Sequence, residues 1–128
     1  MVQEMCIEPL IRNSLSGHIL SDNYLKIKTN EGKEVFRLFI DFINGTEEER
    51  RSIIIRLKER LNEEYMDSEL YYRMIDEVVL AEKREDVYEW ISESIVNYDA
   101  FLQNNFLADA NNTLASVIGH LLKIMINT

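Results

Sequence analysis

The chain has 128 residues, 46% hydrophobic and 29% charged, which is the composition of one globular domain spanning residues 1–128. One proline and four glycines leave little room for a turn-rich β fold, and the lone Cys6 excludes an internal disulfide. The net charge of −9 argues against nucleic acid as a direct partner, because phosphate binding requires a basic surface.

Neither a secretory signal nor a membrane span is expected. The N-terminal stretch MVQEMCIEPL carries two glutamates and no basic residue before Arg12. The longest apolar segment, TLASVIGHLLKIMI, is too short to cross a bilayer and contains Lys123. We therefore expect a cytoplasmic protein, with no membrane partner, in a cell or in a host whose virus or phage carries the gene.

The first elements are short. LIRNSL, residues 10–15, predicts a short helix that Gly17 interrupts. Residues 21–30 then alternate like a strand at YLKIK, but no second convincing strand is present to pair with it. This stretch is expected to be either a short helix or an extended segment.

Residues 34–44, EVFRLFIDFIN, predict a helix that is apolar on nearly its whole circumference. Arg37 and Asp41, spaced i,i+4, form its one thin polar stripe. A helix that is apolar on almost every side belongs at the centre of a bundle.

GTEEERR, residues 45–51, predicts a helix corner. Gly45 is expected in the left-handed conformation that ends the central helix. Thr46 is the expected N-cap of the next helix, and Glu49, three residues on, completes a capping box. The three glutamates then lie in the first turn, where the helix dipole favours carboxylates by about 0.3–1 kcal/mol each. We expect this helix to run to about Tyr65.

Three further helices follow in the prediction. One is capped by Asp67 or Ser68, and the next begins near Glu82 and is interrupted either at Asn97 or at residues 103–105. The last begins at Asp109 or Thr113. The inner stripe of the helix from Glu82 contains Val87, Trp90, Ile91, Ile95, Tyr98 and Leu102. The predicted fold is therefore all-α, a compact bundle of five to seven helices with one apolar central helix.

The excess charge lies in one third of the chain, since residues 59–99 hold thirteen acids against four Lys or Arg. At 100° per residue, five carboxylates fall within roughly 100° of one another on the helix from Glu82. They are Glu82, Glu85, Asp86, Glu89 and Glu93. Their like-charge i,i+4 pairs each destabilise the helix by about 0.2–0.5 kcal/mol. Most of these carboxylates lie beyond the first turn, so the helix dipole offers them little compensation.

Two interpretations of this acidic stripe are open. It is either a solvated face that keeps an acidic protein soluble or a surface that meets a basic partner. In the second interpretation, Tyr88 and Trp90 flank the stripe, and Tyr88 is the better exposed aromatic anchor.

No catalytic, cofactor or metal motif is present. Neither His18 nor His120 belongs to an HExxH or Glu-x-x-His motif, and His120, in an apolar helix, is expected to be structural. No glycine-rich loop could hold phosphates. We therefore expect no cofactor, no metal site and no enzymatic activity, and an enzyme with scattered carboxylates is the least favoured reading.

The function favoured by these observations is that of a small acidic inhibitor or an immunity or antitoxin-type protein. Such a protein would neutralise a basic partner, for example a toxic nuclease or another nucleic-acid-processing enzyme. The alternative is a helical adaptor or regulator, of cellular, phage or viral origin, that holds a partner's amphipathic helix in an apolar groove.

Overall fold

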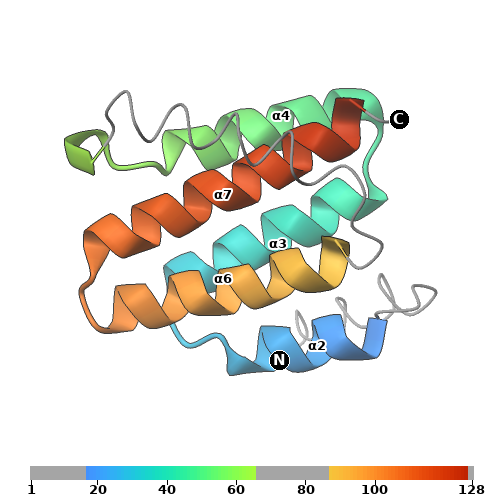
Figure 1. Cartoon of the computed structure of the whole chain (residues 1–128). Helices are drawn as coiled ribbons and strands as arrows, with labels where there is room; N and C mark the ends of the chain where they lie inside the picture. The colour runs from blue at the N-terminus through green and yellow to red at the C-terminus, as the bar shows by residue number, and fades with distance from the viewer. Residues whose placement is uncertain (1–16, 66–86, 127–128) are drawn as a thin grey trace.

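A computed structural model describes residues 17–65 and 87–126 of the chain. These two ranges form five α-helices and one short 3₁₀ helix, and they contain no strand, so the all-α prediction is confirmed (Figure 1). The helices are α2 (Gly17–Lys26), α3 (Asn30–Asn44), α4 (Glu47–Glu59), α6 (Val87–Gln103) and α7 (Leu107–Ile126), and the 3₁₀ helix is η1 (Glu63–Tyr65). The helix predicted after Asp67, and residues 10–15, lie outside the described residues.

Four of the helices form a closed ring. α3 packs against α4 and α6, and α7 packs against the same two helices, while α2 lies along α6. Figure 1 shows that neighbouring helices of the ring run antiparallel. Short connections between consecutive helices favour this arrangement.

Most of the circumference of α3 is buried, as predicted, and α3 is one of the four helices of the ring. Its buried apolar side chains face several directions and include three phenylalanines that are fully enclosed. Edge-to-face contacts join Phe36 to Tyr24 at 5.4 Å and to Phe39 at 5.7 Å between ring centroids. Asp41 is exposed and Arg37 is partly exposed, as the predicted polar stripe requires. The buried residues of α3 are Gly32, Val35, Phe36, Leu38, Phe39, Ile40 and Phe42.

The ambiguous stretch 21–30 is helical up to Lys26 and then turns into α3. α2 begins at Gly17, and the predicted interruption before it involves residues outside the described ranges. Thr29 caps α3 by accepting a hydrogen bond from the Gly32 amide at 2.9 Å. Asp99 of α6 in turn accepts from the Thr29 amide at 2.8 Å and from the Thr29 hydroxyl at 2.6 Å. A distant carboxylate therefore fixes this turn.

Gly32 has a packing role at this turn. A Cβ atom at position 32 would lie 2.5 Å from Oδ1 of Asp99 and 2.9 Å from Cγ2 of Ile27. Only glycine therefore lets the first turn of α3 approach α6 this closely.

The capping box of the 45–51 corner is confirmed. Oγ1 of Thr46 accepts from the Glu49 amide at 3.2 Å, and Oε1 of Glu49 accepts from the Thr46 amide at 2.8 Å. The left-handed conformation predicted for Gly45 is wrong, because its φ is −90° and its ψ is 162°.

The end of α3 is satisfied by a side chain instead. Nε of Arg50 donates to the Phe42 carbonyl at 2.7 Å, and its Nη2 donates to the Ile43 carbonyl at 3.1 Å. These two bonds use carbonyls that a left-handed glycine cap would otherwise satisfy. A Cβ at Gly45 would lie 2.9 Å from the Asp41 carbonyl oxygen, which explains the glycine.

α4 ends earlier than predicted, at Glu59 rather than near Tyr65. Asn62 is the physical reason, because its side chain accepts from the Glu64 amide at 2.9 Å. Its own amide donates to Oδ1 of Asn111 on α7 at 2.6 Å. Asparagine side chains that bond the backbone in this way compete with helix continuation.

α6 continues through Asn97 and ends at Gln103, the second of the two predicted positions. Asn105 has a φ of 61° and turns the chain into α7. α7 begins at Leu107, earlier than either predicted start.

Candidate functional site

The exposed side of α6 is the described part of the predicted acidic stripe. Glu93, Asn97 and Ala100 are exposed and Glu89 is half-buried. These four residues, which we call the α6 face, lie within roughly 80° of one another on the helix and span about 16 Å. Glu82, Glu85 and Asp86 lie outside the described residues, so the structure describes only Glu89 and Glu93 of the five carboxylates.

The opposite side of α6 anchors this face. Ile91, Ile95 and Tyr98 are buried, as their spacing predicts. Ser92 is also buried, where its hydroxyl accepts from Nδ2 of Asn23 at 2.8 Å and donates to the Glu89 carbonyl at 2.7 Å. The α6 face is therefore presented by a helix whose rotation is fixed by core packing and a buried hydrogen bond.

Glu89 and Glu93 have no cationic partner within the part of the chain that the structure describes. α6 itself carries no Lys or Arg, and the sequence has none between Arg84 and Lys123. On α4, by contrast, Glu47 pairs with Arg51 at 2.8 Å. The charges of α4 are therefore balanced locally and those of the α6 face are not.

Tyr88 is not the exposed anchor that the sequence predicts. Its ring is half-buried, with its centroid 6.2 Å from that of Phe39 in the core. Trp90 is half-buried too and stacks on His120 with 3.9 Å between ring centroids. Both aromatic rings point inward because they complete the core between α6 and its neighbours, which the helical wheel alone did not resolve.

His120 is a buried residue of α7, as expected for a structural histidine. It is 1% exposed, and its Nδ1 lies 2.9 Å from the Ser116 carbonyl oxygen. Among the described residues, no group of three or more His, Cys, Asp or Glu side chains could hold a metal ion. No helix in those residues is long and apolar enough to cross a membrane.

Partly exposed ion pairs near the start of α3 join it to the end of α4. Nη1 of Arg60 contacts Oε1 of Glu31 at 2.6 Å, and Nη2 contacts Glu34 at 2.9 Å. Burial and the nearby Glu31 carboxylate raise the pKa of Tyr98. These groups tie the end of α4 and the middle of α6 to α3, and they face no open site.

Asp99 also acts within the fold. Burial raises its pKa, but the bonds from the Thr29 hydroxyl, the Lys28 and Thr29 amides and Gln103 outweigh burial, so the pKa lies below its usual value. Gln103 donates from 2.7 Å and the Lys28 amide from 3.0 Å. A carboxylate bound by four donors is held as an anion and is not available as a base.

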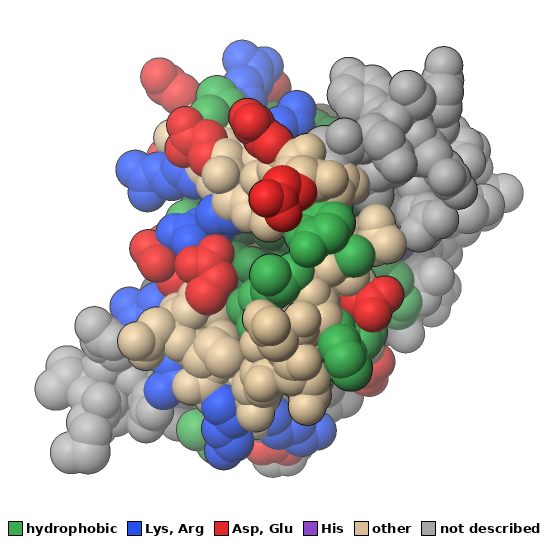
Figure 2. Space-filling model, turned by 90° about the vertical axis from the view of Figure 1, so that its left-hand side faces the viewer, with side chains coloured by type: hydrophobic (Ala, Val, Ile, Leu, Met, Phe, Trp, Pro, Cys, Tyr) green, Lys and Arg blue, Asp and Glu red, His purple; other side chains and the backbone are tan. Residues whose placement is uncertain are grey.

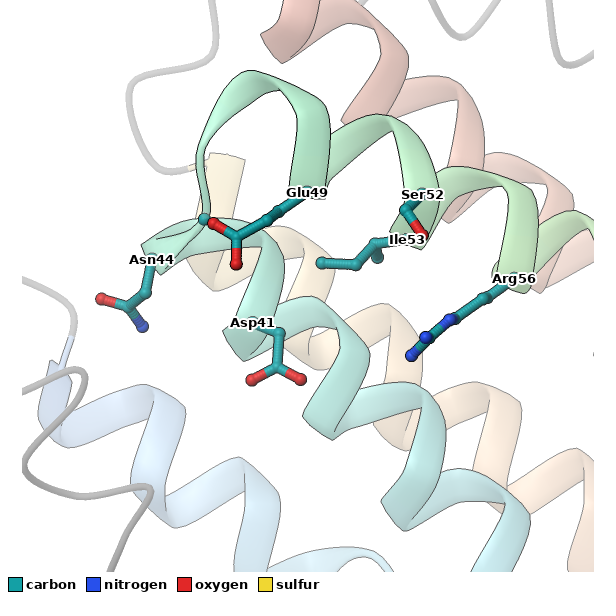
Figure 3. Close-up of a pocket in the computed structure, with 7 residues that line it drawn as sticks. Asp41, Asn44, Glu49, Ser52, Ile53 and Arg56 are labelled. Carbon is teal, nitrogen blue, oxygen red and sulfur yellow. The ribbon is translucent and has the colours of Figure 1, made fainter.

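A polar groove lies between α3 and α4, with a volume of about 450 Å³ (Figure 3). Arg56 and Ile53 extend into it from α4 and Asp41 from α3, while Glu49 turns toward the corner where it forms the capping box. Asp41 and Arg56 form no ion pair with each other. The lining residues are Asp41, Asn44, Gly45, Glu49, Ser52, Ile53 and Arg56.

This groove differs from the apolar groove that an adaptor would need. Ile53 is the only large apolar residue that lines this groove. It is buried in the core, with 6% of its surface exposed, so it offers little apolar surface to a partner. The opposite charges of Asp41 and Arg56 are both exposed, so each is solvated and contributes little binding energy. Sequence reasoning did not find the groove, because it combines residues of two helices that are individually unremarkable.

Comparisons of the chain with protein families, with curated proteins and with solved structures gave no match.

Proposed function

We propose that this protein binds a basic protein partner through the α6 face and thereby inhibits or neutralises it. The observation that supports the proposal is the unpaired state of Glu89 and Glu93 on a helix without any basic residue. The three remaining carboxylates of the predicted stripe, Glu82, Glu85 and Asp86, precede them directly in the sequence.

The physical argument concerns the charge of the free protein. Glu89 and Glu93 are an i,i+4 pair of like charges, which costs an isolated helix about 0.2–0.5 kcal/mol. No hydrogen bond or cation of the described residues compensates this repulsion. A basic surface would convert it into attraction, whereas exposure to solvent alone gives no such gain.

Electrostatic complementarity would also set the kinetics of such an interaction. Opposite potentials raise association rates to about 10⁸–10⁹ M⁻¹s⁻¹ at low salt, and they matter most where a free partner is harmful. The partner class that fits best is a toxic nuclease or another nucleic-acid-processing enzyme, because its substrate cleft must be basic. The protein would then act in the cytoplasm as an immunity or antitoxin-type inhibitor, without catalysis, cofactor or direct contact with nucleic acid.

The adaptor alternative receives no comparable support. The groove between α3 and α4 is lined mostly by polar and charged side chains, and holding an amphipathic helix requires an apolar groove.

Co-purification of the tagged full-length chain from its native host, with identification of the bound protein by mass spectrometry, tests the proposal. We expect one partner of basic isoelectric point whose nuclease or nucleic-acid-binding activity falls when the protein is added. A matched variant pair then locates the interface. Glu89→Gln/Glu93→Gln should weaken binding, whereas Glu48→Gln/Glu59→Gln removes the same charge from exposed positions of α4 and should not.

An acidic partner, or equal affinity for both variant pairs, would contradict the proposal.

A further inference from the structure

The corner between α6 and α7 is a tight Schellman turn. The Phe106 amide donates to the Phe101 carbonyl at 2.8 Å, and the Asn105 amide donates to the Leu102 carbonyl at 3.1 Å. Asn105 occupies the left-handed position with a φ of 61°. The last carbonyls of α6 are thereby satisfied within the backbone, and the corner is rigid.

Phe106 occupies the N-cap position of α7. Its carbonyl accepts from the Ala110 amide at 3.0 Å, but its side chain has no oxygen with which to cap the first amides. Serine, threonine, aspartate or asparagine is strongly preferred at this position. Phenylalanine therefore stands where it does not help the helix to begin.

The side chain of Phe106 is also exposed. It is 55% exposed and the adjacent Leu107 is 37% exposed, while Phe101 and Leu102 are half-buried. We call these four residues the apolar corner. A contact between Phe106 and Phe101 is usual in a Schellman motif and explains an apolar residue at position 106. It does not explain why Phe106 is 55% exposed beside a second exposed apolar side chain.

Carboxylates border this end of the molecule. Glu63 and Glu64 of η1 are exposed, and η1 is held beside α7 by the bond from the Asn62 amide to Asn111. Asp109 is exposed in the first turn of α7. Figure 2 shows hydrophobic side chains in the middle of this end of the molecule, with acidic side chains above and beside them. Lysines and arginines lie at the top, the left and the bottom of the same view, partly next to the acidic side chains.

The apolar corner follows the α6 face in the sequence. Ala100 is exposed in the last turn of α6, Asn104 is exposed just after the helix, and Phe106 follows two residues later. A partner lying along α6 would thus meet carboxylates first and an exposed aromatic side chain at the end of the same helix. Aromatic side chains, including phenylalanine, are enriched at protein–protein interfaces.

We propose that the apolar corner receives an apolar side chain of the basic partner, with Phe106 as the principal contact. The occupant is a protein segment in which lysine or arginine flanks a leucine or another large apolar residue. Charge complementarity supports this choice, because Asp109 is exposed two residues after Leu107 and Figure 2 shows acidic side chains beside the hydrophobic ones. The inference rests on the proposed function, and it adds an apolar anchor to an interface otherwise defined by charge.

A defined probe tests the inference without the native partner. The probe is a fluorescein-labelled helical peptide of leucine and lysine, about 15 residues long. Its affinity for the full chain is measured by fluorescence anisotropy at moderate ionic strength. A second peptide, in which serine replaces every leucine, retains the charge and removes the apolar side chains.

Phe106→Ser is the informative variant, because serine is a preferred N-cap and the net charge does not change. We expect its thermal midpoint to equal or exceed that of the wild type and its affinity for the leucine–lysine peptide to fall about tenfold. Ile55→Ser is the matched control, because Ile55 is 58% exposed on α4. It should leave the affinity unchanged.

The outcomes separate this inference from the proposed function. Tighter binding of the leucine–lysine peptide than of the serine peptide, lost in Phe106→Ser, supports the apolar corner. Equal binding of the two peptides, or equal binding by wild type and Phe106→Ser, overturns it even if Glu89→Gln/Glu93→Gln still weakens binding. If the Glu89→Gln/Glu93→Gln pair alone has no effect, the α6 face fails and the apolar corner stands.

Discussion

Thr46 and Glu49 show how far a local residue pattern determines structure. Each side chain caps the other's backbone amide, at 3.2 Å and 2.8 Å, and both residues belong to a stretch of four. The three glutamates of this stretch thus have a role within the helix. Glu49 is fixed by the cap, and its hydrogen bonds with the Thr46 amide and hydroxyl lower its pKa.

Thr46→Ala tests the corner. The variant should lose about 1 kcal/mol of unfolding free energy, because the Glu49 amide then lacks its side-chain acceptor. Chemical denaturation followed by circular dichroism gives the value. Partner affinity should be unchanged, so a variant that binds about tenfold more weakly with normal stability would show that residues 45–51 belong to the interface.

Asp99 illustrates a residue whose role could not be predicted. Its donors come from residues 28, 29 and 103, and two of the three are about seventy positions away in the sequence. Periodicity placed it on α6, but only the packing of α2 and α3 against α6 brings the donors to it. The same packing requires glycine at position 32.

Asp99 also predicts a pH dependence. Its folded-state pKa lies below the usual value of 3.8. A carboxyl group with a depressed pKa stabilises the fold fully above its unfolded pKa, and this contribution is lost as pH falls through the lower folded pKa. The wild type should therefore lose more unfolding free energy than Asp99→Asn between pH about 5 and about 3. Urea denaturation of both proteins measures the difference, and parallel loss would contradict the role given to Asp99.

At the scale of the helices, α3 was the element most clearly predicted. A nearly continuous apolar circumference predicts burial on most sides of the helix, and the structure confirms this burial. The start of the helix was missed by four residues, because its cap at Thr29 is fixed through Asp99 and not by a local pattern alone.

Phe39→Ala tests the central position of α3. Phe39 is fully buried and contacts Phe36 and Tyr88, so its truncation should cost about 3–5 kcal/mol. Equilibrium denaturation provides the measurement, with Leu25→Ala, at a 59% exposed position of α2, as the control. Wild-type stability in Phe39→Ala would remove α3 from the core.

For α6, the sequence predicted the buried stripe, including Trp90, and the described acidic positions, but it placed Tyr88 too far outside. A helical wheel gives the direction in which a side chain points but not how far the core extends around the helix. Tyr88 was therefore expected on the surface, although its ring packs on Phe39. Phe106 was missed for a related reason. The sequence predicted a connection there, and two successive apolar residues in a connection were the available signal.

At the scale of the whole molecule, charge is distributed unevenly. α3 and α4 carry both signs, whereas the sequence from residue 85 to residue 122 holds only acidic charge. Pairs such as Glu47–Arg51 and Glu31–Arg60 neutralise the first region. This uneven distribution is the reason why we propose the α6 face as the surface that meets a basic protein.

Salt titration of binding to the co-purified partner tests this central claim most directly. The wild type should bind more weakly as ionic strength rises, because the attraction is screened over about 8–10 Å. In Glu89→Lys/Glu93→Lys, like charges would meet, so affinity should fall at least about tenfold at low salt and recover as salt is added. Glu48→Lys/Glu59→Lys changes the net charge equally on α4 and should keep the wild-type slope. If Glu89→Lys/Glu93→Lys binds with the affinity and the salt dependence of the wild type, the α6 face does not contact the partner. It is then only a solvated surface.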